Sequence, residues 1–167
     1  APATVQEMAD FVALGFDLAF KYRTPAIILA DGIVGQMMEK VVLPPQRPRR
    51  TPEEIAAQCP WAITGKPASR QRNIMTTLEL MPQAMEEINI RLQQKYRMIE
   101  ENEVRFATYG IDDCDYLIVA FGSIARISQK AIEMAREQGV KIGIIRPITL
   151  WPFPSAEIER LAARVKG

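Results

Sequence analysis

The chain has 167 residues, of which 48% are hydrophobic and 25% are charged, and its formal net charge is +1. This composition is ordinary for a globular protein with one good core or two small ones. The near-zero charge argues against nucleic acid or a membrane surface as a partner. No apolar run approaches the roughly 18 residues of a membrane span, so we expect a soluble cytoplasmic protein.

The content of histidine and cysteine restricts the possible chemistry. The sequence has no histidine, which excludes histidine-based triads, HExxH zinc sites and histidine acid–base catalysis from this chain. Its two cysteines, Cys59 and Cys114, form neither a CxxC pair nor an iron–sulfur run, and we expect two free thiols. Any electron carrier must therefore sit on another polypeptide or on another part of the protein.

The first part of the chain predicts one helix and one strand. Thr4 and Glu7 have the spacing of a capping box, with Glu7 reaching back to the N-cap amide, and a broadly apolar, mostly buried helix should follow to about Arg23. Pro25 ends that helix and opens a continuously apolar run at residues 26–30. Such a run is typical of a parallel strand covered on both faces.

The middle of the chain changes character. Residues 41–75 are rich in proline, which predicts an irregular linker with a short helical turn after Thr51. A linker of this length is uncommon inside one domain, so we expect it to connect two. Apolar residues then recur at spacings of three and four, which predicts a docking helix from about Met81 to Ala107. We expect its acidic residues on a solvated face: Glu86, Glu87, Glu100, Glu101 and Glu103.

The last part of the chain alternates strands and helices. Strands are predicted at residues 115–121 and 140–145, with a helix at 124–138 between them and another from Pro154-Ser155 to Gly167. Gly139 has the position of a C′ glycine. The first of these helices should bury a face made of Ile127, Ala131, Met134 and Ala135. Two parallel strands are too few for a stable sheet, so both ends of the sequence look cut.

Polar groups follow the first predicted strand. Ligands of open parallel sheets lie beyond the carboxyl ends of the strands. The loop at residues 31–39 lies at such a point, and it could line a cofactor pocket or a subunit interface. The alternative is a strand-to-linker turn packed by its two methionines. The candidate cofactor-binding residues of this loop are Asp31, Gly32, Gly35 and Gln36.

A second candidate site follows the strand at 115–121. Gly122, Ser123 and Arg126 stand at the start of the next helix, where backbone amides, a hydroxyl and a guanidinium could hold an anion. The alternative is a simple turn with Ser123 as the helix N-cap.

Two further segments leave alternatives open. The loop at 146–154 contains three prolines with Trp151 and Phe153, and it is either a protein interface or a loop folded back onto the core. The basic residues of the linker could bind phosphates of a nucleotide-like ligand, or they could form a solvated surface. They are Arg47, Arg49, Arg50, Lys66, Arg70 and Arg72.

Three segments in the same chain carry a family resemblance. They are the helix that begins with VQEM at residues 5–8, the stretch from Pro25 into GQMME at 35–39, and YLIVAFGS at 116–123 together with RPITLWPFP at 146–154. In order and spacing these segments resemble the alpha subunit of the thiamine-diphosphate-dependent 2-oxoacid:ferredoxin oxidoreductases. The 2-oxoisovalerate branch is the nearest, and the match covers essentially the whole chain.

The resemblance implies an α/β fold in three parts. Residues 1–43 would be the closing helix and strand of a thiamine-diphosphate pyrimidine-binding domain. Residues 44–105 would be a proline-rich linker and a long helix. Residues 106–167 would begin a partial transketolase-C-like parallel α/β domain.

The resemblance also implies a function. The family decarboxylates a 2-oxoacid oxidatively to acyl-CoA, with ferredoxin as acceptor; branched-chain 2-oxoacids are favoured here, with 2-oxoglutarate next. Thiamine diphosphate, Mg and iron–sulfur clusters would be held in a complex with a beta subunit and a ferredoxin-like subunit. This chain alone would hold no cofactor and no catalytic residue, and would serve as scaffold and interface.

Under this resemblance the first candidate site, Asp31, Gly32, Gly35 and Gln36, would lie beside the cofactor pocket. The alternative function uses the second candidate site. It is a non-catalytic module that binds a nucleotide or coenzyme A through Gly122, Ser123 and Arg126.

Overall fold

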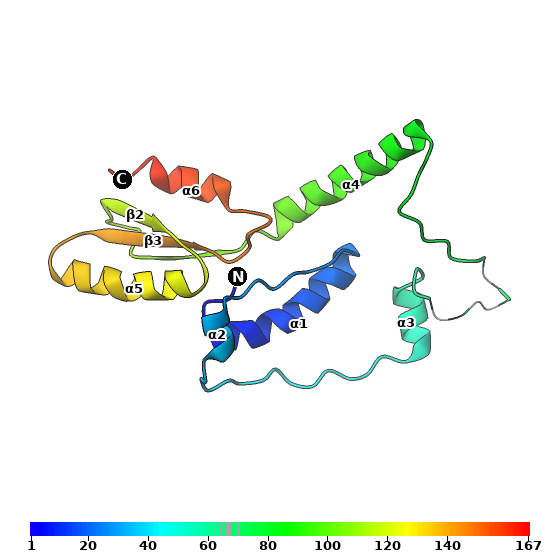
Figure 1. The fold of residues 1–167 in the computed structure, drawn as a ribbon, viewed down its shortest axis with the longest axis horizontal. Helices are drawn as coiled ribbons and strands as arrows, with labels where there is room; N and C mark the ends of the chain where they lie inside the picture. The colour runs from blue at the N-terminus through cyan, green and yellow to red at the C-terminus, as the bar shows by residue number, and fades with distance from the viewer. Residues whose placement is uncertain (64, 66–67, 70) are drawn as a thin grey trace. The chain divides into compact units, whose positions relative to one another are not determined.

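The structure is a computed structural model that describes residues 1–63, 65, 68–69 and 71–167. Lys66 and Arg70 of the predicted basic segment lie outside the described residues. The chain forms two compact units, one made of residues 1–43 and 92–167 and the other of residues 44–91. Figure 1 shows the order of the elements along the chain. The described elements are α1 (Val5–Tyr22), α2 (Gly32–Gln36), α3 (Pro52–Gln58), α4 (Pro82–Asn102), β1 (Phe106–Tyr109), β2 (Tyr116–Val119), α5 (Gly122–Glu137), β3 (Ile142–Pro147) and α6 (Ser155–Ala162).

Helix α1 begins where its capping residue predicts. The Thr4 hydroxyl accepts a hydrogen bond from the Glu7 amide at 3.1 Å, so the N-cap prediction is confirmed. Glu7 does not return to the Thr4 amide; its carboxylate accepts from the Ala3 amide instead. The prediction of a mostly buried helix is wrong for this structure, because Tyr22 is its one buried residue and Phe16 is 64% exposed.

The segment after α1 differs from its prediction. Residues 26–30 form no strand, because no neighbouring strand in the described part of the chain pairs with them. The chain instead enters the short helix α2, whose N-cap is Asp31. Within α2 only Val34 is buried, at 1% exposed, and it anchors this loop to the unit.

The sheet has three strands in the order β1-β3-β2. Strands β2 and β3 are parallel, with Ile118 opposite Ile144, as the alternation of strands and helices predicts. Strand β1 pairs antiparallel with β3 and was missed, because the helix predicted to reach Ala107 already ends at Asn102. The central strand β3 contains the buried residues Ile144 and Ile145. The fold class is α/β as predicted, with one antiparallel strand added.

Helices α5 and α6 flank this sheet from opposite sides (Figure 1). Helix α5 packs on the sheet through Ala125 and Ile132, which join Ile144 in the core. The predicted buried face was wrong, since Ile127 and Met134 are 62% and 54% exposed. Gly139, with φ +84°, follows α5 as the predicted C′ glycine. Helix α6 ends at Ala162, whereas the sequence predicted that it would continue to Gly167.

The smaller unit is largely irregular, as its prolines predict. Its helix α3 begins with Pro52 and has a complete capping box between Thr51 and Glu54. In α4 the residues at spacings of three and four are the less exposed ones: Met85, Ile88, Leu92, Tyr96 and Ile99. No helix in the described part of the chain is long and apolar enough to cross a membrane.

Candidate functional site

The two candidate sites of the sequence come together in space. The Asp31 carboxylate accepts a hydrogen bond from the Val34 amide at 2.9 Å, which caps α2. Its second oxygen accepts from the Ser123 amide at 3.3 Å, at the start of α5. The Ser123 side chain, followed by the Val34 amide, holds the pKa of Asp31 below its ordinary value, and the Ser123 amide adds to this effect. The carboxylate is therefore ionised at neutral pH and already has its partners.

Gly122 begins α5 in a backbone conformation that favours glycine. Its φ is +61°, a left-handed conformation that residues with a side chain rarely adopt, and a Cβ added there would lie 3.6 Å from the Asp31 carboxylate. Ser123 is not the N-cap of α5 as predicted. The N-cap is Phe121, which makes no capping hydrogen bond, and Ser123 lies in the first turn with its amide aimed at Asp31.

The other end of the loop is attached to the next turn of the same helix. Arg126 forms an ion pair of 2.6 Å with Glu39, whose second carboxylate oxygen accepts from the Val5 amide at 3.3 Å. The bond from Arg126, followed by the bond from Val5, lowers the pKa of Glu39. The three predicted anion-binding residues are thus brought together, and the groups that face them are carboxylates of this chain, Asp31 and Glu39.

The remaining candidates of the loop face outward. Gly32, Gly35 and Gln36 are exposed, and a Cβ added at either glycine would meet nothing within 4 Å. The glycines are therefore not required for close packing among the described residues. The loop has a buried anchor at Val34, an attachment at each end, and an open outer surface.

A buried carboxylate lies at the end of α4, where a solvated one was predicted. Glu103 is 5% exposed and binds Lys21 at 2.7 Å, the Tyr22 hydroxyl at 2.6 Å and Arg105 at 2.8 Å. Burial acts to raise the pKa of Glu103, but these three donors outweigh it and lower the pKa to about 2. Glu103 is therefore an ionised structural group and not a proton donor or acceptor at neutral pH.

Sequence reasoning missed Glu103, although a signal was present. It lies four residues after Ile99 and so continues the spacing of the less exposed residues of α4. A carboxylate at the next position of such a series indicates a buried ion pair. A solvated position was predicted because no residue type distinguishes Glu103 from the neighbouring glutamates, Glu100 and Glu101, which are exposed.

A second missed pair joins α1 to the central strand. Arg146 donates to both carboxylate oxygens of Glu7, at 2.7 and 2.6 Å. Burial acts to raise the pKa of Glu7, but the hydrogen bonds from Arg146 and the Ala3 amide, together with the nearby positive charges, outweigh it and lower the pKa. The capping-box position of Glu7 indicated only a local role, and no pattern in the sequence connects it with a residue 139 positions later.

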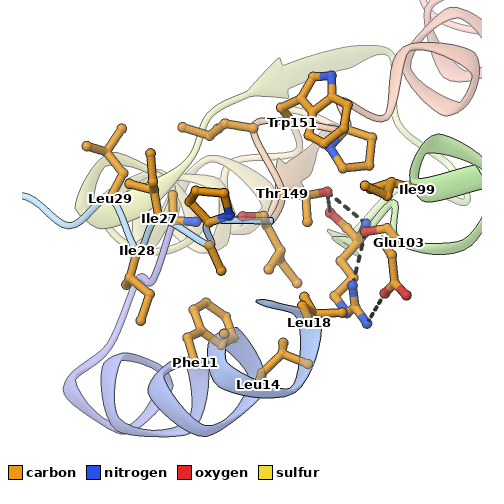
Figure 2. A pocket seen from close by; sticks show the side chains of 18 of the residues that line it. Phe11, Leu14, Leu18, Ile27, Ile28, Leu29, Ile99, Glu103, Thr149 and Trp151 are labelled. Atoms are coloured by element: carbon orange, nitrogen blue, oxygen red, sulfur yellow. Dashed lines mark hydrogen bonds and ion pairs between the residues drawn. The ribbon is translucent and has the colours of Figure 1, made fainter. Parts of the chain in front are cut away.

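An apolar pocket of about 400 Å³ lies in the larger unit. Figure 2 shows Phe11, Leu14 and Leu18 of α1 facing it from one side and Trp151 from the other. Its charged side chains, Glu103 and Arg105, bind each other. The Thr149 hydroxyl is also paired, since it accepts from the Arg105 amide at 2.9 Å. The lining therefore offers mainly hydrophobic contact.

Other predicted features have simple outcomes. Trp151 and Phe153 are 52% and 45% exposed, so neither folds fully onto the core, and the Trp151 ring contacts Tyr96 edge to face. Cys59 and Cys114 are free thiols as expected. The described residues contain no cluster of three acidic, cysteine or histidine side chains that could hold a metal ion.

Comparisons with known proteins give a consistent assignment. Residues 1–103 match the thiamine-diphosphate-binding domain of pyruvate flavodoxin/ferredoxin oxidoreductase, and residues 114–167 match core domain II of pyruvate:ferredoxin oxidoreductase. The chain is 43% identical to the ketoisovalerate oxidoreductase subunit VorB of Methanothermobacter thermautotrophicus over 97% of its own length and 44% of that protein. It is 31% identical to the 2-oxoglutarate synthase subunit KorA of Methanocaldococcus jannaschii, over 98% of this chain and 49% of that protein.

A solved structure supports the fold alone. The 2-oxoglutarate:ferredoxin oxidoreductase from Magnetococcus marinus, with 2-oxoglutarate, coenzyme A and succinyl-CoA bound, superposes with a TM-score of 0.52 at 20% identity. The superposition covers 63% of this chain and 20% of that one. The chain also spans less than half the length of the relatives named above.

Proposed function

The chain belongs to the pyruvate flavodoxin/ferredoxin oxidoreductase family, and on this premise we propose that it is part of a 2-oxoacid:ferredoxin oxidoreductase subunit. The whole enzyme would decarboxylate a 2-oxoacid oxidatively, transfer the acyl group to coenzyme A and reduce ferredoxin. This chain would supply scaffold and subunit interface, in a cytoplasmic complex with a beta subunit and a ferredoxin-like subunit. The boundaries 1–43, 44–105 and 106–167 remain our proposal for its domains.

The contacts of one helix turn favour a scaffold role for this chain over the alternative of a ligand-binding module. The turn that could hold a phosphate, Gly122 to Arg126, faces Asp31 and Glu39 of the same chain. An anionic ligand such as a nucleotide or coenzyme A would have to displace two carboxylates and their bonds. This arrangement favours an internal attachment between the two matched domains.

We propose that the described residues would border only one part of thiamine diphosphate. Open space over Gly32 and Gly35 and the exposed Gln36 carboxamide would allow the organic part of the cofactor to approach the loop. The described residues contain no acidic cluster for the Mg ion that accompanies a diphosphate. Thiamine diphosphate, when bound, would supply the decarboxylation chemistry, and we assign its diphosphate, Mg and the iron–sulfur clusters to other parts of the complex.

The substrate that we propose is a branched-chain 2-oxoacid, with 2-oxoglutarate as the runner-up. The support is the identity of 43% to a ketoisovalerate oxidoreductase subunit, against 31% to a 2-oxoglutarate synthase subunit. Discrimination between these substrates depends on contacts to a branched apolar side chain or to a second carboxylate.

The test is an anaerobic assay of the purified full complex with coenzyme A, a low-potential electron acceptor and a set of 2-oxoacids. We expect acceptor reduction that depends on both the 2-oxoacid and coenzyme A, fastest with 3-methyl-2-oxobutanoate. Fastest reduction with 2-oxoglutarate would overturn the substrate choice alone. No reduction with any 2-oxoacid would overturn the proposed function.

A further inference from the structure

Helix α5 and the loop at residues 31–39 are joined at two points, and we infer that this double attachment is a positioning clamp for the loop. We call the contacts Asp31–Ser123 and Glu39–Arg126 the loop clamp. The inference rests on the proposed function, in which the outer surface of the loop borders the thiamine diphosphate pocket. Arg126 and Glu39 are positioning residues, because they would act through the loop and would not touch the cofactor.

The two contacts of the clamp lie at opposite ends of the loop. Asp31 is the residue before α2 and Glu39 lies three residues after it. Both bind the amino-terminal end of α5, Asp31 at Ser123 in the first turn and Glu39 at Arg126 at the start of the second. Glu39 also accepts from the Val5 amide, so the start of α1 is tied to the same point. Between the two attachments Val34 is buried at 1% exposed while Met38 is 99% exposed. The segment is therefore fixed at both ends and at its centre, and its outer side remains available for contact.

Stability alone does not explain these contacts. The side chains of Arg126 and Glu39 are 42% and 26% exposed, and pairs of this exposure contribute little to the free energy of unfolding. A fixed loop position has a much larger effect where it borders a reacting group, since a displacement of about 1 Å can cost about a hundredfold in rate. The clamp is thus suited to setting position.

The clamp also connects two domains. Asp31 and Glu39 lie in the part that matches the thiamine-diphosphate-binding domain, and Arg126 lies in the part that matches core domain II. Core domain II would therefore control the position of a loop that belongs to the cofactor domain. This link assigns a role to the amino-terminal end of α5 that a simple packing helix would not have.

The experiment uses the full complex with variants Arg126→Met, Arg126→Lys and Glu39→Gln. The readouts are the Kd for thiamine diphosphate, measured by calorimetry on the complex stripped of cofactor, together with kcat and the KM for coenzyme A. Lys130→Met is the matched control. Lys130 lies on the same helix, four residues after Arg126, and its ion pair is with Glu133, which is not part of the clamp. Thermal unfolding of each complex checks for a loss of folding.

We expect Arg126→Met to weaken thiamine diphosphate binding about tenfold, with the KM for coenzyme A and the melting temperature unchanged. Arg126→Lys keeps the charge and should restore most of the affinity. The double variant Arg126→Met with Glu39→Gln should bind thiamine diphosphate no more weakly than Arg126→Met alone, because both changes act on the same ion pair.

Two results would overturn the clamp. One is a Kd within twofold of the native value in both Arg126→Met and Glu39→Gln. The other is a loss of affinity that Lys does not restore and that follows a lower melting temperature, which would indicate a purely structural role. The native complex serves as the reference, since its failure to bind thiamine diphosphate or to oxidise any 2-oxoacid would count against the proposed function instead.

Discussion

Residues 106–167 and residues 1–43 differ in where their apolar side chains lie. The carboxy-terminal part buries Ile132, Ile144 and Ile145 between its own sheet and helices. The amino-terminal part leaves Phe16 and Phe20 of α1 exposed. Its contacts with the rest of the larger unit include four polar attachments, made by Glu7, Tyr22 with Lys21, Asp31 and Glu39.

The difference shows that two kinds of interaction have different roles in one compact unit. Hydrophobic burial, which is non-directional and large in sum, stabilises the carboxy-terminal part. Charge-assisted hydrogen bonds, which are directional and small in net free energy, orient the amino-terminal part against it. Variants of the first kind of contact should therefore change stability most, and variants of the second kind should change orientation with smaller effects on stability.

The largest effect is expected in the core of the carboxy-terminal part. Ile132 is 0% exposed, and Ile132→Ala should lower the free energy of unfolding by about 2–4 kcal/mol, measured by urea denaturation. Ile127→Ala on the same helix is the control, because Ile127 is 62% exposed and its loss should cost under about 0.5 kcal/mol. Equal losses would mean that α5 packs through the face predicted from the sequence.

The second-largest effect on the free energy of unfolding is expected at Glu103 and its three donors, Lys21, Tyr22 and Arg105. Glu103→Gln leaves three donors with a weaker acceptor, and it should cost about 1–3 kcal/mol at neutral pH. Glu101→Gln, at an exposed position of the same helix end, should cost almost nothing.

The same cluster predicts a pH dependence. The pKa of Glu103 in the folded chain is about 2, below its ordinary value of 4.5, so the carboxylate stabilises the fold above pH 4.5. This stabilisation should be lost as the pH falls from 4.5 toward 2. Thermal unfolding across that window should therefore show a shallower decline in Glu103→Gln than in the native chain, and parallel declines would contradict the assignment.

The sequence predicted the parts of the fold that depend on local patterns. Thr4 as N-cap, the α3 capping box at Thr51, Gly139 at C′ and the parallel pair of β2 and β3 all follow from residue types at short spacings. The strand at residues 26–30 and the buried face of α5 were wrong, because both depend on which neighbour is present, and that information is not local.

The candidate site shows the same limit. Asp31, Ser123 and Arg126 were recognised as polar groups at the ends of predicted strands, and that placement follows from topology. Their pairing was not predictable, because Ser123 lies 92 residues after Asp31 and either could have faced an external ligand. Glu103 and the Glu7–Arg146 pair were missed for the same physical reason, since an ion pair between distant residues leaves no periodic signal.

A smaller effect is expected at the bidentate pair. Arg146→Met removes both hydrogen bonds to Glu7 and should cost about 1–2 kcal/mol, measured by the midpoint of urea unfolding. Arg146→Lys keeps the charge but not the two-point geometry, so it should fall between the native chain and Arg146→Met. If Arg146→Lys unfolds at the same urea concentration as the native chain, then the charge alone orients α1 and the two-point geometry of the guanidinium contributes nothing.

The smallest effect is expected on the outer face of α1, and it tests the comparison from its other side. Phe16 is 64% exposed, so Phe16→Ala removes little buried area, gains slightly in helix propensity and should change the free energy of unfolding by under about 0.5 kcal/mol. Phe11→Ala makes the same change in the same helix, but Phe11 lines the apolar pocket and should cost about 1–2 kcal/mol. Urea denaturation of both variants measures the contrast. A cost at Phe16 as large as that at Phe11 would show that hydrophobic burial, and not the polar attachments, also stabilises the outer face of α1.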